Sequence, residues 1–415
     1  MIKEYYNLNT QESRVQIEDS QIEAVKNKNI TKKSVRVFDE EKKTCALAAS
    51  VGNVPDGELE QKAINLLSLD IPYDYELEQN TKGHFNKEIL RIKNSQELEK
   101  FTAKMLEDLK NISHKFVVSG AVSSVTTQKT LKNSLNLDLS ARKTVLNLDC
   151  MLKQKGSGNI FDTGVNFAGF DITDEDYQDF LKNADFIASA CLSEIVPLET
   201  KKYRVLVKSG LLLRKFYSDV KAIAYEEKSS LLAGKLNTSI FKENININEC
   251  NDYETFTTYI PFDDEGIIRN KELIIVENGI LKNIQYDKLR AKKYGKTTTG
   301  NGFREYNTNT YISSGPFRFL GVDQKISDLI SNDLVVIPYI SSGGDYLPNG
   351  NFSGPIQMAF VFKNGKFIGK APQITLTGNY LECFNTDFIS LGCNDLWKTI
   401  EDETFVYCDM MVNVN

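Results

Sequence analysis

The chain has 415 residues, of which 41% are hydrophobic and 26% are charged, and its formal net charge is −6. This length predicts two domains, and the acidic balance argues against a nucleic-acid partner, which normally requires a basic face. No apolar run reaches the roughly 20 residues that span a bilayer, and residues 1–6 lack the pattern of a signal peptide. We therefore expect a cytoplasmic protein that makes no use of a membrane.

Cysteine and lysine usage supports the same interpretation. Seven cysteines are scattered over the chain, and none falls in a CxxC pair. An odd, unpaired set predicts reduced, mostly buried thiols that pack as small apolar side chains, as in the cytoplasm. The lysines near residues 26–33 and 292–296 are interleaved with acids along the chain, which favours a solvated face.

The first half predicts strands and helices in alternation. Residues 15–25, 33–37 and 44–49 have strand patterns, with a turn at 39–43. A helix is expected from Pro55 onward. Its predicted core face consists of Leu59, Ala63, Leu66 and Leu67.

Two further helices have start signals. Asn94 with Glu97 resembles a capping box ahead of an apolar stripe formed by Leu98, Phe101, Met105 and Leu109. Thr173 with Asp176 starts another helix, whose expected core residues are Tyr177, Phe180, Leu181, Ala184, Ile187 and Cys191. Between these helices, residues 116–125 and 141–152 predict strands, and residues 132–138 predict a loop.

The second half is richer in turns, with 13 of the 25 glycines between Gly295 and Gly392. Asn-Gly turns predict hairpins at residues 273–284 and 358–368, because this dipeptide suits the positive φ angles of a type I′ turn. Residues 334–340 predict a buried strand. The fold class is therefore α+β. An N-terminal α/β domain is predicted at residues 1–196 and a strand-rich, mainly antiparallel domain at 203–415, joined by the polar stretch 197–202.

Histidine decides what chemistry the chain can perform. Only His84 and His114 occur, and neither HExxH, HExxxH nor GxSxG is present. Zinc hydrolysis and Ser-His-Asp catalysis both need imidazoles that converge on a metal or a nucleophile. We therefore predict no catalytic residues, no metal site and no cofactor. The Gly300–Gly302 and Gly343–Gly344 segments do not match a phosphate loop, so they are interpreted as backbone geometry.

The acidic run Asp263, Asp264, Glu265 and Gly266 has two interpretations. Clustered carboxylates can bind calcium or perform acid–base chemistry. Adjacent acids ahead of a strand are more often part of a turn or a cap, and we favour that alternative.

Several loops of the second half, taken in order, resemble one family. The segments are PFDDEG at 261–266, LIIVENGILK at 273–282, YD at 286–287, AKKYG at 291–295, TGNG at 299–302, GNFSG at 350–354, TGNY at 377–380 and LGCNDL at 391–396. This succession resembles the TldD/PmbA family, also called modulators of DNA gyrase. Fainter support comes from a strand–hairpin–helix opening before Leu69 and from the loop at 131–135.

The resemblance implies an N-terminal α/β domain, a strand-rich C-terminal domain and two-fold or pseudo-two-fold dimers. It also implies two kinds of subunit. The TldD kind carries HExxxH on a helix early in the second domain and, with a later cysteine, holds zinc for peptide hydrolysis. The TldE/PmbA kind lacks the motif and pairs with a TldD subunit.

In this chain the corresponding helix is expected at about residues 209–226, and it contains no histidine. Its apolar residues Leu212, Leu213, Phe216 and Val220 predict core packing instead. Cys393 and Cys408 lie near the family's C-terminal strands, but a cysteine without histidines is not a zinc site.

The main hypothesis is a non-catalytic TldE/PmbA-like subunit of a TldD/TldE-type metalloprotease assembly that acts on unfolded or leader peptides. Zinc is expected only in a TldD-like partner. The predicted partners are that subunit, or a second copy in a homodimer, and an extended peptide. The candidate substrate or partner loops contain Asp263, Asp264, Glu265, Gly266, Thr299, Gly300, Asn301, Gly302, Phe352 and Ser353. The alternatives are a homodimeric peptide-binding scaffold that has lost proteolysis, and a peptidase with unusual ligands drawn from Asp, Glu and Cys.

Overall fold

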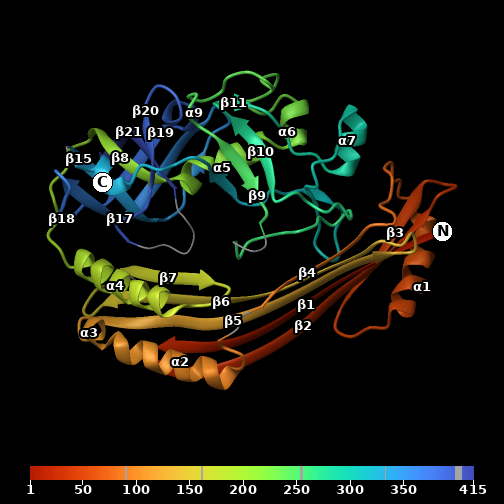
Figure 1. Cartoon of the computed structure of the whole chain (residues 1–415), viewed down its shortest axis with the longest axis horizontal. Helices are drawn as coiled ribbons and strands as arrows, with labels where there is room; N and C mark the ends of the chain where they lie inside the picture. The colour runs from red at the N-terminus through yellow and green to blue at the C-terminus, as the bar shows by residue number, and fades with distance from the viewer. Residues whose placement is uncertain (89–90, 160–161, 253–255, 332, 398–403) are drawn as a thin grey trace.

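The computed structural model describes residues 1–88, 91–159, 162–252, 256–331, 333–397 and 404–415. It has an α+β fold, in which a long curved sheet from the first half of the chain underlies a group of shorter sheets from the second half (Figure 1). The chain passes from the N-terminal sheet to the C-terminal sheets between Cys191 and Lys201. The domain boundary at 197–202 stays a prediction.

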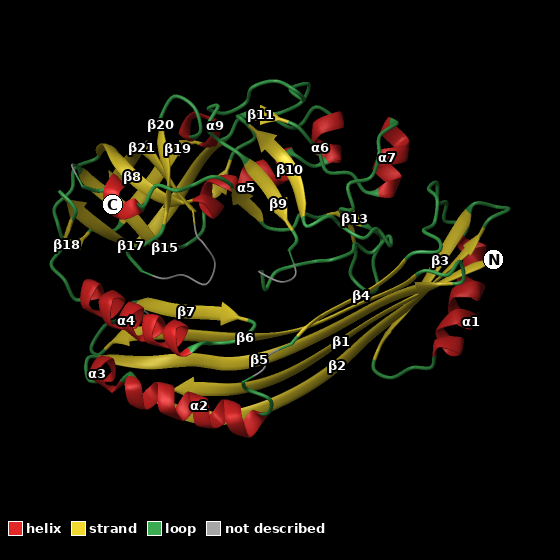
Figure 2. Ribbon diagram, viewed as in Figure 1, coloured by secondary structure: helices red, strands yellow, loops and turns green. Residues whose placement is uncertain are grey.

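The N-terminal sheet is built from unusually long strands (Figure 2). Within the described residues it has seven strands in the order β3-β2-β1-β5-β6-β4, and β7 pairs with β6. Their bounds are β1 Ile2–Glu18, β2 Gln21–Asp39, β3 Thr44–Val51, β4 Lys82–Lys87, β5 Phe116–Asn133, β6 Asp138–Gln154 and β7 Thr163–Gly169. Neighbouring strands are antiparallel, apart from the parallel β4–β6 pair.

The strand predicted at residues 15–25 is wrong, because the chain turns in the middle of it. Asp19 and Ser20 have φ angles of 47° and 63°, so they form a two-residue turn of the primed kind that joins β1 to β2. Asp and Ser adopt positive φ angles less readily than Asn and Gly do. These two residues therefore indicate a turn only weakly. The strands at 116–125 and 141–152 are confirmed but extend further, and the loop between them shrinks to residues 134–137.

Helices cover parts of this sheet. They are α1 Asp56–Leu66, the 3₁₀ turn η1 Leu67–Leu69, α2 Ser95–Asp108, α3 Lys110–Ser113 and α4 Asp174–Cys191. The capping box at Thr173 is confirmed. At α2, Asn94 caps as predicted, but the Glu97 carboxylate accepts from the amide of Lys93 instead. On α1, Leu59 and Ala63 are buried as expected, whereas Leu66 is 40% exposed.

The described residues of the second half form three sheets. Within the described residues, the largest has the order β15-β8-β21-β19-β17-β16, with β18 on β17 and β20 on β21, and it closes on itself because β15 also pairs with β17. Its strands are β8 Lys201–Lys208, β15 Leu334–Ser341, β16 Asp345–Tyr346, β17 Asn351–Lys363, β18 Lys366–Lys370, β19 Ile374–Asn379, β20 Phe388–Cys393 and β21 Thr404–Val414. The buried strand predicted at 334–340 is therefore confirmed as β15.

Two smaller sheets lie beside it. They contain β9 Ile247–Cys250, β10 Glu272–Glu277, β11 Ile280–Leu281 and β14 Phe317–Phe319 in one, and β12 Gly302–Phe303 and β13 Tyr311–Ile312 in the other. The helices are α5 Ser209–Asp219, α6 Ala222–Glu226, α7 Lys288–Tyr294, α8 Ile326–Leu329 and α9 Tyr380–Cys383. Both predicted Asn-Gly turns are confirmed, with positive φ at Asn278, Gly279, Asn364 and Gly365, although the strand after Gly279 ends at Leu281.

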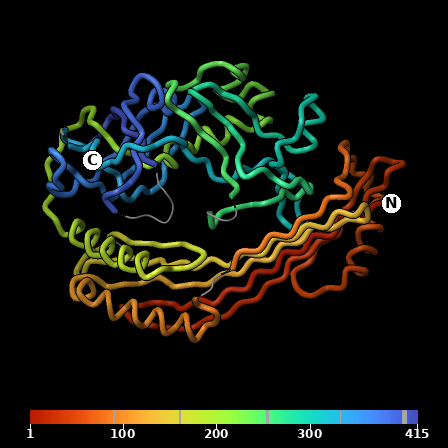
Figure 3. The backbone as a smooth tube through the Cα atoms, viewed as in Figure 1, coloured from red at the N-terminus to blue at the C-terminus, as the bar shows by residue number. Residues whose placement is uncertain are grey.

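The closed sheet is buried on both faces. Val205 and Val207 of β8 pack into a core shared with α5, while Leu206 between them packs into a second core shared with α2 and α4 of the first half. Phe186 of α4 stacks on Trp397 and contacts Phe360 edge-on in that second core. Because the two halves share this core, they pack as one body, and the tube trace of Figure 3 shows the long strands running beneath the C-terminal part.

The described part of the chain contains no helix whose length and apolarity suit crossing a membrane. All seven cysteines are free thiols; five are buried, and Cys45 and Cys393 are half-buried. The predicted pattern of buried, unpaired thiols is confirmed.

Candidate functional site

Helix α5 starts directly after the central strand β8. Leu212, Leu213 and Phe216 are buried in the core beneath the closed sheet, as the sequence predicts. The helix expected at 209–226 is divided, however. Lys221 adopts extended backbone angles and bridges to Gln285. That contact satisfies backbone groups that a continuous helix would have bonded internally.

The C-terminal turn of α5 holds a buried charge. Asp219 is fully buried, forms an ion pair with Lys215 one turn earlier, and accepts a 2.7 Å hydrogen bond from the Tyr380 hydroxyl. Burial, and then the neighbouring carboxylate, raise the pKa of Tyr380 far above its ordinary value. The carboxylate is therefore held by a cation and a neutral phenol, which is the condition for keeping a buried charge ionised.

The acidic run forms a buried turn. Asp263 Oδ1 accepts from the amides of Glu265 and Ile267 at 3.0 and 2.9 Å, and its Oδ2 accepts from the Gly302 amide at 3.0 Å. Asp264 accepts from the Arg304 amide and pairs with Lys129 of β5 at 2.6 Å. The turn interpretation of this run is confirmed.

Burial alters the protonation of this turn. It raises the pKa of Asp263 to about 6, and burial followed by the Asp263 charge raises the pKa of Glu265 to about 8. Glu265 accepts from the Lys288 amide at 2.7 Å through Oε2, while its Oε1 has no hydrogen-bond partner among the described residues. The Glu265 carboxyl therefore holds its proton more tightly than an exposed carboxyl does, and Asp263 accepts hydrogen bonds from three backbone amides.

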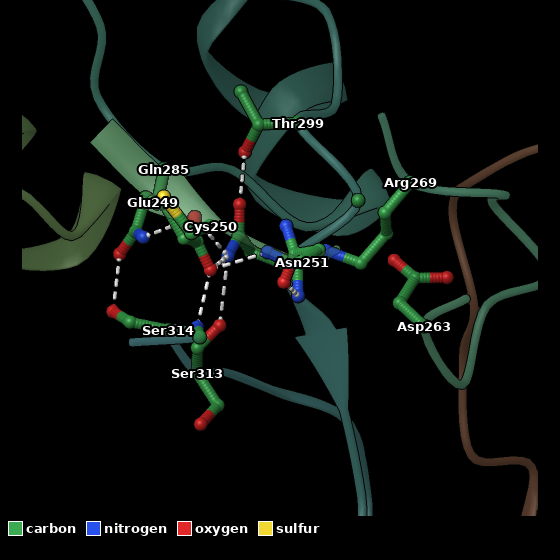
Figure 4. A network of polar contacts seen from close by, with 12 residues as sticks. Glu249, Cys250, Asn251, Asp263, Arg269, Gln285, Thr299, Ser313 and Ser314 are labelled. Atoms are coloured by element: carbon green, nitrogen blue, oxygen red, sulfur yellow. Dashed lines mark hydrogen bonds and ion pairs between the residues drawn. The ribbon is translucent and has the colours of Figure 1, made fainter. Parts of the chain in front are cut away.

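A second buried network continues from the TGNG loop. Glu249 of β9 pairs with Arg269 and accepts from the side chains of Asn301 and Gln285. Figure 4 shows Glu249 at the centre of these contacts, with Ser314 bonded to Gln285 at 2.6 Å. Thr299 donates to Asn301 at 2.7 Å, and Asn301 donates to the Ser313 carbonyl at 2.8 Å. This loop is therefore fixed by the Glu249 side chain of β9 and by the backbone of the segment before β14.

The structure gathers eight of the predicted loop residues and separates the other two. Residues 263–266 and 299–302 meet through the bond between Asp263 and Gly302. Phe352 and Ser353 lie apart on β17, where Phe352 is buried against Tyr346 and Ser353 is exposed. Glu249 and Arg269 were not predicted as site residues, because a single acid in a four-residue strand and an isolated arginine form no pattern.

The second half of the chain is similar to a known protein family. Residues 200–410 match the family model described as the PmbA/TldA metallopeptidase C-terminal domain, which covers half of the chain. The chain belongs to the PmbA/TldD family. The closed sheet as far as Met410, helix α5 and the Glu249 network lie within the matched residues. The acidic turn lies within them too, but its ion-pair partner Lys129 does not.

Relatives agree with this membership, and a solved structure shares the fold. The chain is 30% identical over 293 residues to an uncharacterized protein of Methanocaldococcus jannaschii, spanning 69% of this chain and 67% of the relative. It is 36% identical over 147 residues to the metalloprotease TldD homolog of Buchnera aphidicola from Acyrthosiphon pisum, but this covers only 33% of the chain and 28% of that relative. The crystal structure of TldE from Thermococcus kodakarensis has the same fold, with a TM-score of 0.82, 17% identity, and coverage of 99% of this chain and 96% of that chain.

The zinc that the PmbA/TldD resemblance implies does not fit α5 of this chain. Neither histidine is on that helix: His84 is in β4, where it contacts Ser140 at 2.8 Å, and His114 follows α3. Cys408 is buried in the core and Cys393 donates to the Gln324 carbonyl. Within the described residues no three His, Cys, Asp or Glu side chains converge in a group able to hold a metal ion. The donor set that zinc requires is therefore not assembled there.

Proposed function

We propose that this chain is a non-catalytic TldE/PmbA-type subunit of a TldD/TldE-type metalloprotease assembly that acts on unfolded or leader peptides. The observation that carries the proposal is the composition of α5. Its inner face is aliphatic and aromatic, and the acid of its last turn, Asp219, is neutralised by Lys215. Helix α5 therefore stabilises the fold and takes no part in catalysis. The zinc ion and the hydrolytic activity belong to the TldD-like partner. A cytoplasmic location suits its free thiols.

We infer that the chain helps to hold an extended peptide by strand addition. Strand β16 pairs only with β17 in the described part of the chain, so its other edge offers unpaired backbone groups. The edge lies beside α5, because the Tyr346 hydroxyl donates to the Leu211 carbonyl. Gly343 and Gly344 precede it, and Gly343 has a φ angle of 110° that favours glycine. An edge strand next to α5 would bring a peptide close to the helix that carries the zinc motif in TldD subunits.

Co-expression with a TldD-like chain tests the subunit assignment. We expect the two chains to elute together from gel filtration and to hydrolyse an unfolded peptide, while this chain alone hydrolyses none and holds less than about a tenth of an equivalent of transition metal. Changing the histidines of the partner's motif should abolish activity. Replacing the exposed Lys62 of α1, which is remote from the β16 edge, by Ala should leave activity unchanged.

Two outcomes would overturn the assignment. Clean separation of the two chains, with this chain eluting as a dimer, would favour the homodimeric scaffold. Stoichiometric metal together with turnover by this chain alone would establish a peptidase with unusual ligands.

A further inference from the structure

A cavity of about 570 Å³ lies where the two halves of the chain meet, away from α5 and the buried networks. We name it the junction cavity. Its walls come from the end of β6 and the described residues between β6 and β7, from the end of α4, and from strands β17 and β18. Its lining residues are Gln154, Gly158, Asn159, Asp162, Cys191, Ile195, Gln357, Met358, Lys370, Ala371, Pro372 and Gln373. The volume falls in the range of about 300–1,000 Å³ that is typical of small-molecule sites.

Opposite charges line this cavity without forming a direct ion pair among the described residues. Lys370 and Asp162 both face it, yet no ion pair within 4 Å joins these two described side chains. Burial raises the pKa of Asp162, but hydrogen bonds from Asn159, the Gln154 amide and Ser157, together with the Lys370 charge, outweigh burial and lower the pKa overall. The Asp162 carboxylate therefore faces the cavity in ionised form, with the Lys370 side chain also in the lining.

Both charged groups keep unused hydrogen-bonding capacity. Lys370 donates to the Cys191 carbonyl, which uses one of the three donors of its ammonium. Asp162 accepts from Ser157 and Asn159 at Oδ1 and from the Gln154 amide at Oδ2, three bonds to a carboxylate that can accept about four. Each group also has a structural role, and each has room for one further partner.

The rest of the lining is amphipathic. Gln154, Gln357 and Gln373 contribute carboxamides whose side chains make no hydrogen bond within the described part of the chain. Ile195, which is 59% exposed, and Met358 add apolar surface. Carboxamides can donate to and accept from peptide groups, while the apolar surface suits small aliphatic side chains.

We propose that the junction cavity binds a zwitterionic ligand, a short peptide or a free amino acid, with its carboxylate at Lys370 and its ammonium toward Asp162. The size of the cavity favours a peptide of two or three residues over a single amino acid. The proposal does not depend on a TldD-like partner, because every lining residue belongs to this chain.

Calorimetric titration of the purified chain tests the proposal with three probes: trialanine, alanine, and trialanine blocked by N-acetylation and C-amidation. We expect saturable binding of trialanine, and at least about tenfold weaker binding of the blocked peptide, because it lacks both charges. Alanine binding as tightly as trialanine would support the site and assign a free amino acid as its ligand. No saturable heat with trialanine or alanine up to about 10 mM, or equal binding of the blocked peptide, would overturn the proposal.

Matched variants locate the binding. Gln357→Trp places a large ring in the cavity from an exposed position on β17 and should abolish binding without unfolding the chain. Lys370→Gln should weaken binding at least about tenfold. Lys366 is an exposed lysine on β18, the strand that also carries Lys370, and it lies outside the cavity. Lys366→Gln should therefore bind the peptide as the parent does. Unchanged binding in folded Gln357→Trp would place any ligand elsewhere and refute the proposal.

Discussion

Gly302 shows how closely the acidic turn and the TGNG loop are packed. A Cβ built at this position would overlap the Glu265 carboxylate, and both residues are buried. Neither partner can move freely, because Asp263 bonds the Gly302 amide and the Lys288 amide bonds Glu265. We expect Gly302→Ala to lower the free energy of unfolding by about 1–3 kcal/mol through overpacking, as measured by urea denaturation.

Gly210→Ala is the matched control for this prediction. Gly210 is exposed in the first turn of α5, and a Cβ there would meet nothing within 4 Å. Because alanine has the higher helix propensity, this change should raise stability by up to about 1 kcal/mol. Equal effects at the two glycines would show that the contact with Glu265 is not what excludes a side chain at residue 302.

The protonation of Asp263 and Glu265 should make stability depend on pH. Their pKa values rise from 3.8 and 4.5 to about 6 and 8 in the folded chain, so the folded state holds these protons more tightly than the unfolded state. Their contribution is therefore complete below about pH 4 and is lost as the pH rises through 6 and then 8. We expect Glu265→Gln, which retains an acceptor for Lys288, to lose less stability than the parent between pH 5 and 8.5.

Denaturation curves of the two proteins at several pH values measure this difference. Carboxylates far from residue 265 contribute equally to both chains, so the comparison reports on residue 265 together with its neighbour Asp263, whose charge raises the pKa of Glu265. Parallel curves for parent and variant would contradict a raised pKa at Glu265.

At the scale of elements, α5 depends on its buried ion pair. Asp219→Ala would leave the Lys215 ammonium without its counter-charge and the Tyr380 hydroxyl without an acceptor. Removing one partner of a buried pair typically costs about 3–5 kcal/mol. We expect a loss of that size in thermal or urea unfolding. Lys62→Ala, which removes an exposed i,i+4 pair with Glu58 on α1, should cost less than about 0.5 kcal/mol.

The elements that were predicted correctly depend on residues close together in the sequence. The Asn278-Gly279 turn and the Thr173 cap follow from backbone angles and side-chain reach within four residues. The turn at Asp19-Ser20 was not predicted, because these two weak turn-forming residues lie within an alternating apolar pattern. The division of the predicted helix at Lys221 was not predicted either, because it depends on a backbone bridge to Gln285 in a distant loop. Local propensity yields to such tertiary contacts.

At the scale of the whole molecule, the two halves are joined by charges as well as by the shared core. Arg304 is fully buried and pairs with Glu4 of β1 at 2.9 Å, across 300 residues of sequence. Lys292 also pairs with Asp74 across the halves, but both side chains are more than half exposed. Burial sets the energy of such pairs, because water and salt screen exposed charges.

We expect Glu4→Gln to destabilise the chain by about 3–5 kcal/mol, since it removes the carboxylate that is ion-paired with the buried Arg304 guanidinium. Asp74→Asn should cost less than about 1 kcal/mol, with an effect that disappears at high salt. Urea unfolding at low and high ionic strength checks both. A salt-sensitive loss at Glu4, or equal losses at the two sites, would contradict the burial of the Glu4–Arg304 pair.

The sequence by itself determined the apolar strand patterns, the Asn-Gly turns, the helix caps and the lack of imidazoles on α5, because each of these depends on residue type or on neighbours a few positions away. Only the tertiary structure decided that Glu249 finds Arg269, that Glu4 finds Arg304, and that the acids at 263–265 are buried. These pairings depend on strand order and on how one half of the chain lies over the other. Burial and charge pairing between distant segments leave no periodic pattern in the sequence.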